Sequence, residues 1–158
     1  QNQIPGYSMR MQEVTAAMLT PQIARLPVIK DVHVANWHLL HTLINDHPNI
    51  EIPMPLPQVD SFCDTMQFHL VGLSRQDADR FIDVMKQEGV PMQIFGAKRN
   101  ARDFRQWEYI EAHKDELKDT IANIEFACDL SLQPHLTEEN IRVIGRVVRE
   151  VLDYINRT

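Results

Sequence analysis

The sequence is short of cysteine and contains no long apolar run. Its two cysteines, Cys63 and Cys128, lie in apolar surroundings without a partner at metal-ligand spacing, so we expect two reduced, buried thiols. No apolar stretch approaches the roughly 20 residues that cross a bilayer, and residues 1–10 lack the charged-then-apolar layout of a signal peptide. These shortages exclude a membrane-spanning chain and indicate a cytoplasmic protein.

Positive charge is also scarce. The chain has 16 Lys and Arg against 22 Asp and Glu, and the formal net charge of −6 argues against broad binding to nucleic acid. Its hydrophobic (44%) and charged (24%) fractions are those of an ordinary globular protein. We expect one domain over residues 1–158. Residue 1 is glutamine rather than methionine, so we also expect a piece of a longer protein.

Motifs that would make the chain catalytic by itself are missing. There is no glycine-rich phosphate loop and no G-x-S-x-G elbow. Every lysine stands in a polar context, so none is predicted to form a Schiff base. Cys63 and His69 are not expected to meet as a nucleophile and its base. We therefore expect no catalytic residue within these residues.

Three histidines fall in one predicted helix and raise the question of a metal. His38 and His41 are three residues apart and can share a helix face, with His33 further back. No carboxylate or cysteine completes the set, whereas zinc takes three or four protein ligands with ordered support. We expect surface or interface histidines and no metal site.

Periodicity predicts helices and short strands that mingle along the chain. Apolar spacing and turn signals predict helices from Ser8 onward and near residues 28–46, 75–88, 118–126 and 137–156, and strands near residues 50–52, 65–73, 90–95 and 129–133. This order is typical of the α/β class in the α+β style, with N-terminal helices followed by a small sheet with packed helices.

Local signals predict where the helices begin and end. Thr20 with Pro21 indicates a second N-cap, and Pro27 is expected to break or kink the chain. Ser74 is a predicted N-cap and Gly89 a predicted helix stop. The apolar face of the long helix is predicted to hold Val32, Ala35, Leu39 and Leu43.

The stretch with the most chemistry is residues 98–109, which read KRNARDFRQWEY. Four cations and three aromatic rings interleave there, and such a segment suits an anion such as a carboxylate or phosphate beside a ring. The alternative is a solvated loop whose aromatic side chains pack down on the domain. We call residues 98–109 the basic-aromatic segment.

Three blocks of the sequence carry a family resemblance. Residues 6–18 read GYSMRMQEVTAAM and are followed by PQI, residues 68–71 read FHLV, and residues 129–141 read DLSLQPHLTEENI. They are similar to G-x-N-x-R-M-x-E-x-x-A-A, H-L-[FY]-V and L-S-L-P-x-H-P-x-L-T-E-E-D of the DegT/DnrJ/EryC1/StrS aminotransferases. The blocks stand in family order at family spacing and cover nearly the whole chain.

This resemblance implies one part of a pyridoxal 5'-phosphate enzyme. The chain would be the C-terminal small domain of a fold-type-I enzyme, usually a homodimer, whose large domain carries the cofactor lysine and is missing here. Family members transfer an amino group from glutamate or glutamine to a keto sugar, commonly nucleotide-linked, and a minority are dehydratases with the same cofactor. The implied partners are thus a keto-sugar substrate, an amino-donor amino acid and the missing large domain, and the chain would be inactive alone.

Three residues can be aligned with functional positions of the family. Ser8 stands where the family has an asparagine that reaches across the dimer to the cofactor phosphate, and serine has a shorter reach. A plain N-cap is the alternative role of Ser8. Arg10 aligns with the family arginine, whose fork suits a phosphate or carboxylate, and a structural salt bridge is its alternative. His69 aligns with the strand histidine and is expected to face substrate, with burial in the sheet as the alternative.

The chain departs from the family pattern after Val90. Many members continue with a histidine-tyrosine pair and a substrate-facing loop, whereas residues 91–96 here read PMQIFG and the basic-aromatic segment follows. We expect this segment to bind an acidic substrate such as a sugar acid, with Arg102 or Arg105 on the carboxylate and Trp107 against the ring. A free-standing α/β regulatory or interaction module without a cofactor is the competing interpretation of the chain.

Overall fold

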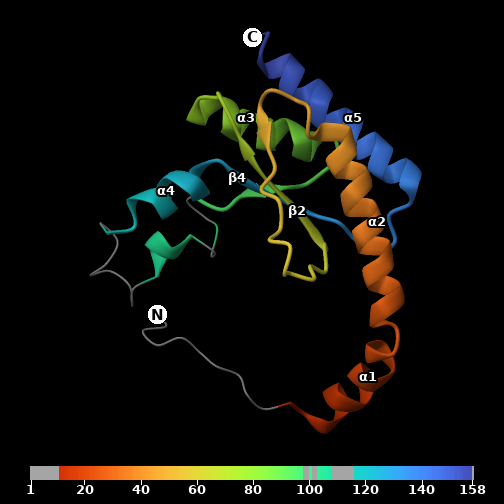
Figure 1. Cartoon of the computed structure of the whole chain (residues 1–158). Coiled ribbons are helices and arrows are strands. Elements are labelled where there is room, and N and C mark those ends of the chain that lie inside the picture. Colours follow the sequence, from red (N-terminus) through yellow and green to blue (C-terminus); the bar gives the residue numbers. More distant parts are fainter. Residues whose placement is uncertain (1–10, 98–99, 101–102, 108–115, 158) are drawn as a thin grey trace.

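The computed structural model describes residues 11–97, 100, 103–107 and 116–157 (Figure 1). Two helices lead into an alternation of short strands and helices, which confirms the predicted fold class. The elements are α1 (Glu13–Ile23), α2 (Leu26–Ile44), β1 (Ile50–Glu51), β2 (Thr65–Leu70), α3 (Arg75–Gln87), β3 (Gln93–Ile94), η1 (Phe104–Gln106), α4 (Lys118–Glu125), β4 (Ala127–Ser131) and α5 (Glu138–Ile155).

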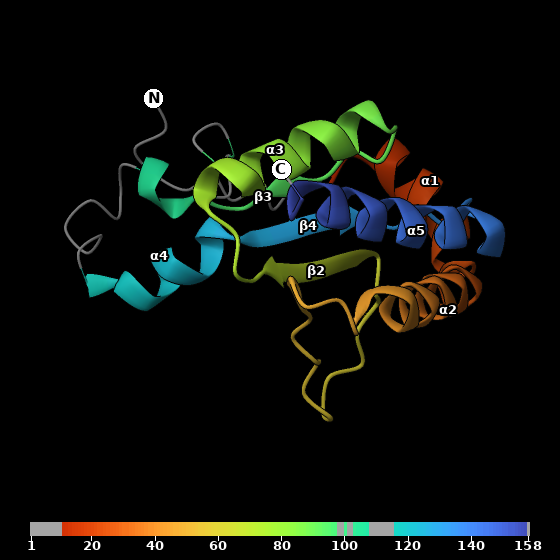
Figure 2. The same cartoon turned by 90° about the horizontal axis from the view of Figure 1, so that it is seen from above.

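The four strands form one antiparallel sheet in the order β1-β2-β4-β3. The central pair is fixed by Phe68 opposite Cys128 and Met66 opposite Leu130. Helices α3 and α5 lie above the sheet in Figure 1, and Figure 2 shows the same two helices in front of the strands. The opposite face of the sheet is not covered by any helix of the described residues, and α1 lies on that side at the far end of α2.

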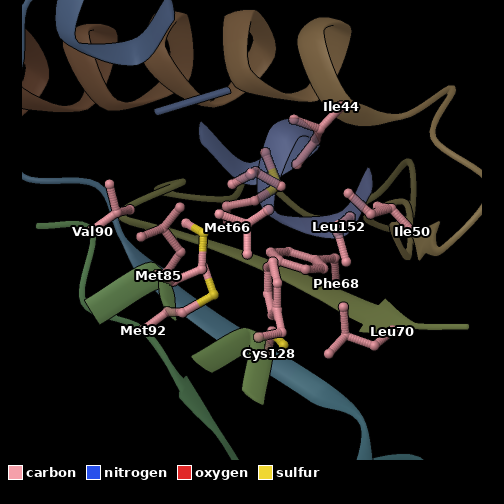
Figure 3. Close-up of a cluster of buried hydrophobic side chains, with 14 of the residues drawn as sticks. Ile44, Ile50, Met66, Phe68, Leu70, Met85, Val90, Met92, Cys128 and Leu152 are labelled. Carbon is pink, nitrogen blue, oxygen red and sulfur yellow. The ribbon is translucent and has the colours of Figure 1, made fainter. Parts of the chain in front are cut away.

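Side chains alternate across β2, so the strand buries one face and leaves the other accessible. Met66, Phe68 and Leu70 are buried, whereas Gln67 between them is exposed. The buried face meets the apolar stripes of the helices, and Figure 3 shows Ile44, Met85 and Leu152 gathered around Phe68. Each such side chain contributes about 1.5–3 kcal/mol through burial.

Helices α3 and α5 begin with the same local device. The hydroxyl of Ser74 accepts from the backbone N–H of Asp77 at 3.2 Å, and that carboxylate accepts from the backbone N–H of Ser74. Thr137 and Asn140 repeat this reciprocal pair at α5. Gly89 ends α3 with a φ of 80°, which glycine adopts without strain. The predicted caps and stop of α3 are therefore confirmed.

Helices α2 and α5 pack against each other, and their chains run in the same general direction. The side-chain amide of Asn36 donates to the carbonyl of Leu136 at 3.2 Å, and further along Arg149 donates to the carbonyl of Leu43 at 3.1 Å. The second contact lies further toward the C-terminus on both helices, so the two helix axes point in the same direction. Arg149 also pairs with Asp46 just beyond the end of α2, and this pair lowers the pKa of the Asp46 carboxyl.

Two predictions about the N-terminal helices are wrong. Pro21 does not begin a second helix but lies inside α1, where the hydroxyl of Thr20 donates to the carbonyl of Ala16 at 2.9 Å. The two helices are separated by a turn at Ala24 and Arg25, so Pro27 does not break a helix but occupies the first turn of α2, as its fixed φ allows. Helix α1 begins at Glu13 with Gln12 at its N-cap, and Ser8 lies outside the described residues.

The buried face of α2 is also shifted from the predicted one. Ala35 is exposed, and the buried residues are His33, Asn36, Trp37, Leu40 and Ile44. His33 was expected on the surface but is only 4% exposed and lies 5.2 Å from the ring of Phe62. Leu39 and Leu43 of the predicted face do pack partly buried against the core, so the buried face is turned by about one residue toward Asn36 and Trp37.

The remaining boundaries differ by a few residues. Strand β4 begins at Ala127, two residues earlier than predicted, and β3 keeps only two of the six predicted residues.

No helix in the described part of the chain is long and apolar enough to span a membrane. Both cysteines are free thiols, with Cys128 buried and Cys63 half-buried.

Candidate functional site

The predicted site residues that the structure describes lie at one end of the sheet. His69 is on β2 opposite Ala127, the first residue of β4. The backbone N–H of Phe95 donates to the carbonyl of that same Ala127 at 2.9 Å, and the chain then turns into the segment that carries Arg105 and Trp107. The end of β2, the start of β4 and the residues after β3 therefore form one corner, which we call the sheet corner.

Arg105 holds this corner together through its guanidinium group. Its Nε donates to Oδ1 of Asp103 at 2.9 Å, and one Nη donates to Oδ2 of the same carboxylate at 2.9 Å. That nitrogen also donates to the carbonyl of Gly96 at 2.9 Å, while the other lies 3.5 Å from Oε1 of Glu125. The two-pronged contact with Asp103 has the geometry of the strongest arginine–carboxylate pairs.

The ion pair between Asp103 and Arg105 is largely shielded from solvent. Asp103 is 3% exposed, so its charge depends on the arginine and on its own hydrogen bond from the backbone N–H of Arg105 at 3.0 Å. The bond to Asp103 raises the pKa of Arg105 above its usual value, and the nearby charges of Asp103 and Glu125 act in the same direction. The guanidinium is therefore charged at every working pH, with its donors directed into the corner.

A glycine and a second arginine fix the corner against α4. The backbone N–H of Gly96 donates to the carbonyl of Ile124 at 2.8 Å, and a Cβ at Gly96 would stand 2.9 Å from that oxygen. Arg75 donates from Nη1 to the carbonyl of Glu125 at 2.9 Å. The last turn of α4 is thus held by Gly96 on one side and by the start of α3 on the other.

Trp107 follows the short helix η1 and is exposed to solvent over 37% of its surface. Its backbone N–H donates to the carbonyl of Phe104, which is itself buried. One ring of the basic-aromatic segment therefore packs down while another faces outward. Arg102, like Ser8 and Arg10, lies outside the described residues.

A polar row on the uncovered sheet face was missed by the sequence analysis. Gln67 and Gln93 both stand opposite Asp129, so the three side chains line up across β2, β4 and β3 on one face. Both glutamines are exposed, whereas Asp129 between them is only 6% exposed, and directly opposed residues have Cβ atoms about 5 Å apart. We call these three residues the polar row. The signal that could have found it is the alternation of β2 and β4, but the row also requires the strand register.

A hollow of about 180 Å³ lies at the other end of β2. Trp37, Pro53 and Pro55 give it apolar walls, and Asp64 and Gln67 are among its polar lining residues. Cys63 also lines it and has a φ of 59°, an uncommon conformation for a residue with a side chain. The hollow therefore shares Gln67 with the polar row.

The described residues provide no place for a covalently held cofactor or a metal. Lys86 and Lys118 are exposed, and Lys30 pairs with the exposed carboxylate of Asp60. A Schiff-base lysine stands in a desolvated pocket, whereas Lys86 and Lys118 stand in solvent and Lys30 is held in an ion pair. Groups of three or more metal-ligating side chains are also absent from the described part.

Solved structures of sugar-modifying enzymes have this fold. A Streptococcus pneumoniae protein assigned as a sugar aminotransferase, solved in its PMP form, aligns with a TM-score of 0.78 at 14% identity over 96% of this chain and 38% of its own. A Helicobacter pylori aminotransferase involved in the biosynthesis of pseudoaminic acid gives 0.78 at 14% over 94% and 39%. The E. coli GDP-4-keto-6-deoxy-D-mannose-3-dehydratase gives 0.65 at 16% over 92% and 37%.

These matches show that the chain shares its fold, helices packed on a small antiparallel sheet, with one part of these larger enzymes. The sequence profile of the DegT/DnrJ/EryC1/StrS aminotransferase family matches residues 1–149, and the chain belongs to that family. No curated protein matches it by sequence. The chain spans about two fifths of the length of the solved chains that it matches.

Proposed function

We propose that this chain is the small domain of a pyridoxal-phosphate aminotransferase that moves an amino group from glutamate or glutamine to a keto sugar. Membership of the aminotransferase family carries this proposal. The solved relatives extend well beyond the matched region, and the described lysines of this chain are solvent-exposed or ion-paired. The cofactor and its lysine would therefore belong to the remaining part of the parent protein, which supplies the electron sink for the reaction.

The residues of this chain would bind and orient the substrate. The sheet corner presents Trp107 to solvent on a segment that Arg105 and Asp103 anchor. The N–H groups of Arg105 already donate to Asp103 and Gly96. Arg102 is therefore the better candidate for binding a substrate carboxylate, with Trp107 beside the sugar ring. His69 lies on the same end of the sheet. Ser8 and Arg10 would serve the cofactor phosphate and a substrate anion, as the family alignment implies.

The polar row would bind the hydroxyl groups of the sugar. Gln67 and Gln93 are exposed and each offers an amide donor and acceptor, whereas Asp129 between them is buried and would lie beneath the ligand rather than against it. Hydroxyl groups both donate and accept, so this combination suits a polyol better than an apolar ligand. The row lies on the sheet face that no described helix covers.

A dehydratase is the second candidate for the parent protein. The E. coli dehydratase shares the fold with a TM-score of 0.65, below the 0.78 of the two aminotransferases. We therefore place aminotransfer first. A free-standing module is disfavoured because the matched chains are more than twice as long as the region they share with this one.

The test uses the full-length parent protein. We expect a yellow, borohydride-reducible bond between pyridoxal phosphate and a lysine outside residues 1–158, and loss of the colour when glutamate or glutamine is added. Return of the colour with a keto sugar identifies an aminotransferase, whereas a deoxygenated keto product identifies a dehydratase. A colourless protein would leave the free-standing module.

The acidic-substrate expectation has a separate test. Arg102→Ala should raise the KM for an acidic keto sugar by about tenfold or more, because a charged hydrogen bond is lost. Arg142→Ala is the matched control, since Arg142 is exposed on α5 and pairs with Glu138 one turn away. An unchanged KM in Arg102→Ala would remove the acidic substrate from the proposal.

A further inference from the structure

A groove lies between α3 and α5, away from the sheet corner and the polar row. The two helices pack side by side and turn their buried residues toward the sheet (Figure 2). On their outer side they leave a hollow of about 440 Å³, which Val84, Val147 and Val151 line with apolar surface. This volume is in the range of sites that hold a ligand or an anchoring side chain. We call this hollow the helix groove.

Arg80 and Tyr154 give the helix groove a fixed wall at one end. Tyr154 is its last lining residue along α5, and Arg80 lies one turn before Val84 on α3. The guanidinium carbon of Arg80 lies 4.9 Å from the centre of the tyrosine ring, and Nη2 donates to the phenol oxygen at 2.9 Å. The ring is 49% exposed, so these contacts hold in place a side chain that solvent would otherwise leave mobile.

The rim of the helix groove is negatively charged. Glu88 and Glu150 both line it and are exposed, and neither forms an ion pair within the part of the chain that the structure describes. Glu88 stands at the C-terminal end of α3, where the helix dipole adds partial negative charge. Lys86 is close in sequence but lies about 200° round the helix from Glu88. No lysine or arginine is among the described residues that line the groove.

We propose that the helix groove binds a segment of another protein that presents a lysine or arginine side chain beside an apolar one. The apolar stem of such a cation suits the valine floor, and its charged head suits Glu88 and Glu150. An acidic segment is repelled, and a wholly apolar segment leaves both carboxylates desolvated without a partner. The inference does not depend on the proposed function, because the groove is on the opposite side of the sheet from the polar row (Figure 1).

A second copy of this chain is a poorer occupant. A two-fold contact of groove with groove brings Glu88 and Glu150 of both copies together, and like charges that meet at an interface cost free energy. A head-to-tail contact avoids this repulsion by placing a basic surface of one copy in the groove of the next. The chain has only 16 Lys and Arg against 22 Asp and Glu, so it offers less basic surface than a basic partner does.

The chemistry of the occupant is tested with short fluorescent peptides and the full-length protein. Lysine alternates with leucine in the probe peptide, glutamate replaces lysine in a second peptide, and serine replaces leucine in a third. By fluorescence anisotropy we expect the lysine–leucine peptide to bind at least about tenfold more tightly than either of the others. Equal binding of the lysine–serine peptide would show attraction to acidic surface in general and overturn the proposal, as would tighter binding of the glutamate–leucine peptide.

The place of binding is tested by one charge reversal and its control. Glu150→Lys should weaken binding of the lysine–leucine peptide by about tenfold or more. Glu139→Lys makes the same change of net charge at an exposed position about 16 Å away on the same helix, and should alter binding by less than about twofold. Equal weakening by the two variants would remove the groove as the binding site.

The mass of the full-length protein in solution separates a foreign partner from a second copy. We expect the same mass for the unsubstituted protein and for Glu150→Lys, because the groove is not an interface between copies. A lower mass for Glu150→Lys would show a second copy in the groove and overturn the proposal. Bound pyridoxal phosphate and aminotransfer are measured on the same samples, so failure of the proposed function is recorded separately from failure of the docking.

Discussion

Gly96 is needed for space rather than for backbone freedom. A methyl group there would stand 2.9 Å from the carbonyl oxygen of Ile124 and 3.1 Å from Cα of Glu125, and backbone atoms cannot rotate away. We expect Gly96→Ala to lower the free energy of unfolding by about 1–3 kcal/mol, as overpacking does. Denaturant unfolding of the parent protein measures the change.

Gly89 provides the contrasting control. Its φ of 80° disfavours a side chain, but nothing lies within 4 Å of the added Cβ. Gly89→Ala should cost about 1 kcal/mol through backbone strain, and Gly89→Asn should cost less because asparagine tolerates this conformation. At Gly96 the order reverses, since asparagine is larger than alanine. Equal costs for alanine and asparagine at Gly96 would contradict the steric account.

Cys128 is predicted to be inert until the protein unfolds. Burial raises the pKa of its thiol from 9.0 to about 12, while the charge of Arg75 acts in the opposite direction and that of Asp129 in the same one. The neutral thiol is therefore favoured in the folded state, so its contribution to stability is complete below about pH 9 and falls as pH rises toward 12. We expect no iodoacetamide labelling of native Cys128 at pH 9 and full labelling in urea. Native labelling with a midpoint near pH 9 would show an exposed thiol instead.

The residue scale also separates what sequence can predict from what it cannot. The cap at Ser74 and the stop at Gly89 were predicted correctly because both depend on residues within one turn. The burial of His33 was missed because Phe62, 29 positions along the chain, provides its contact. Local chemistry is readable from the sequence, whereas a long-range contact needs the fold.

At the scale of elements, the packing of α2 on α5 depends on a small residue. A Cβ at Gly145 would lie 2.9 Å from Cβ of Leu43, so the two helices approach closely at this point. Gly145→Ala gains helix propensity of about 1 kcal/mol but forces the helices apart. We expect a net loss of about 1–2 kcal/mol in unfolding free energy.

A double-mutant cycle tests this contact. Leu43→Gly alone removes part of the helix interface, whereas Leu43→Gly combined with Gly145→Ala removes both the Cβ and the Cδ1 that would crowd the new methyl group. The double variant should be more stable than the sum of the single effects by about 1 kcal/mol. Simple additivity would show that the two residues do not compete for the same space.

The elements also explain the errors of the sequence analysis. The buried face of α2 differs from the predicted one because Asn36 lies on it. The side-chain amide of Asn36 donates to the carbonyl of Leu136, a partner outside the helix that the pattern of apolar residues does not show. Thr20 and Pro21 resembled a start signal, yet α1 continues through them. Proline forbids one backbone bond but does not end a helix whose other bonds remain.

At the scale of the molecule, the fold class and the family could be predicted from three blocks of sequence, and both are confirmed. The candidate site could be predicted only in part. Arg105 was expected to bind substrate, but its contacts with Asp103 and Gly96 depend on the turn after β3. Its role toward substrate stays a prediction, as do those of His69 and Trp107. The polar row needed the register of three strands.

The last prediction concerns which face of the molecule meets substrate. The polar row lies on the uncovered sheet face, and the outer surfaces of α3 and α5 are turned the other way (Figure 2). Gln67→Leu in the full-length protein should raise the KM for the keto sugar by about tenfold, since a hydrogen bond of about 1.4 kcal/mol is lost. Gln87→Leu, the same change on the exposed end of α3, should leave KM within about twofold.

The effect of Gln67→Leu is best measured on the two half-reactions separately. Cofactor spectra follow the reaction with the amino donor, and that step should be unchanged in Gln67→Leu because the donor has no sugar hydroxyl groups to bind. A rise in KM for the keto sugar alone therefore assigns the uncovered face to the sugar. Equal losses in both half-reactions would point to a general disturbance of the domain, and equal behaviour of Gln67→Leu and Gln87→Leu would place the sugar elsewhere.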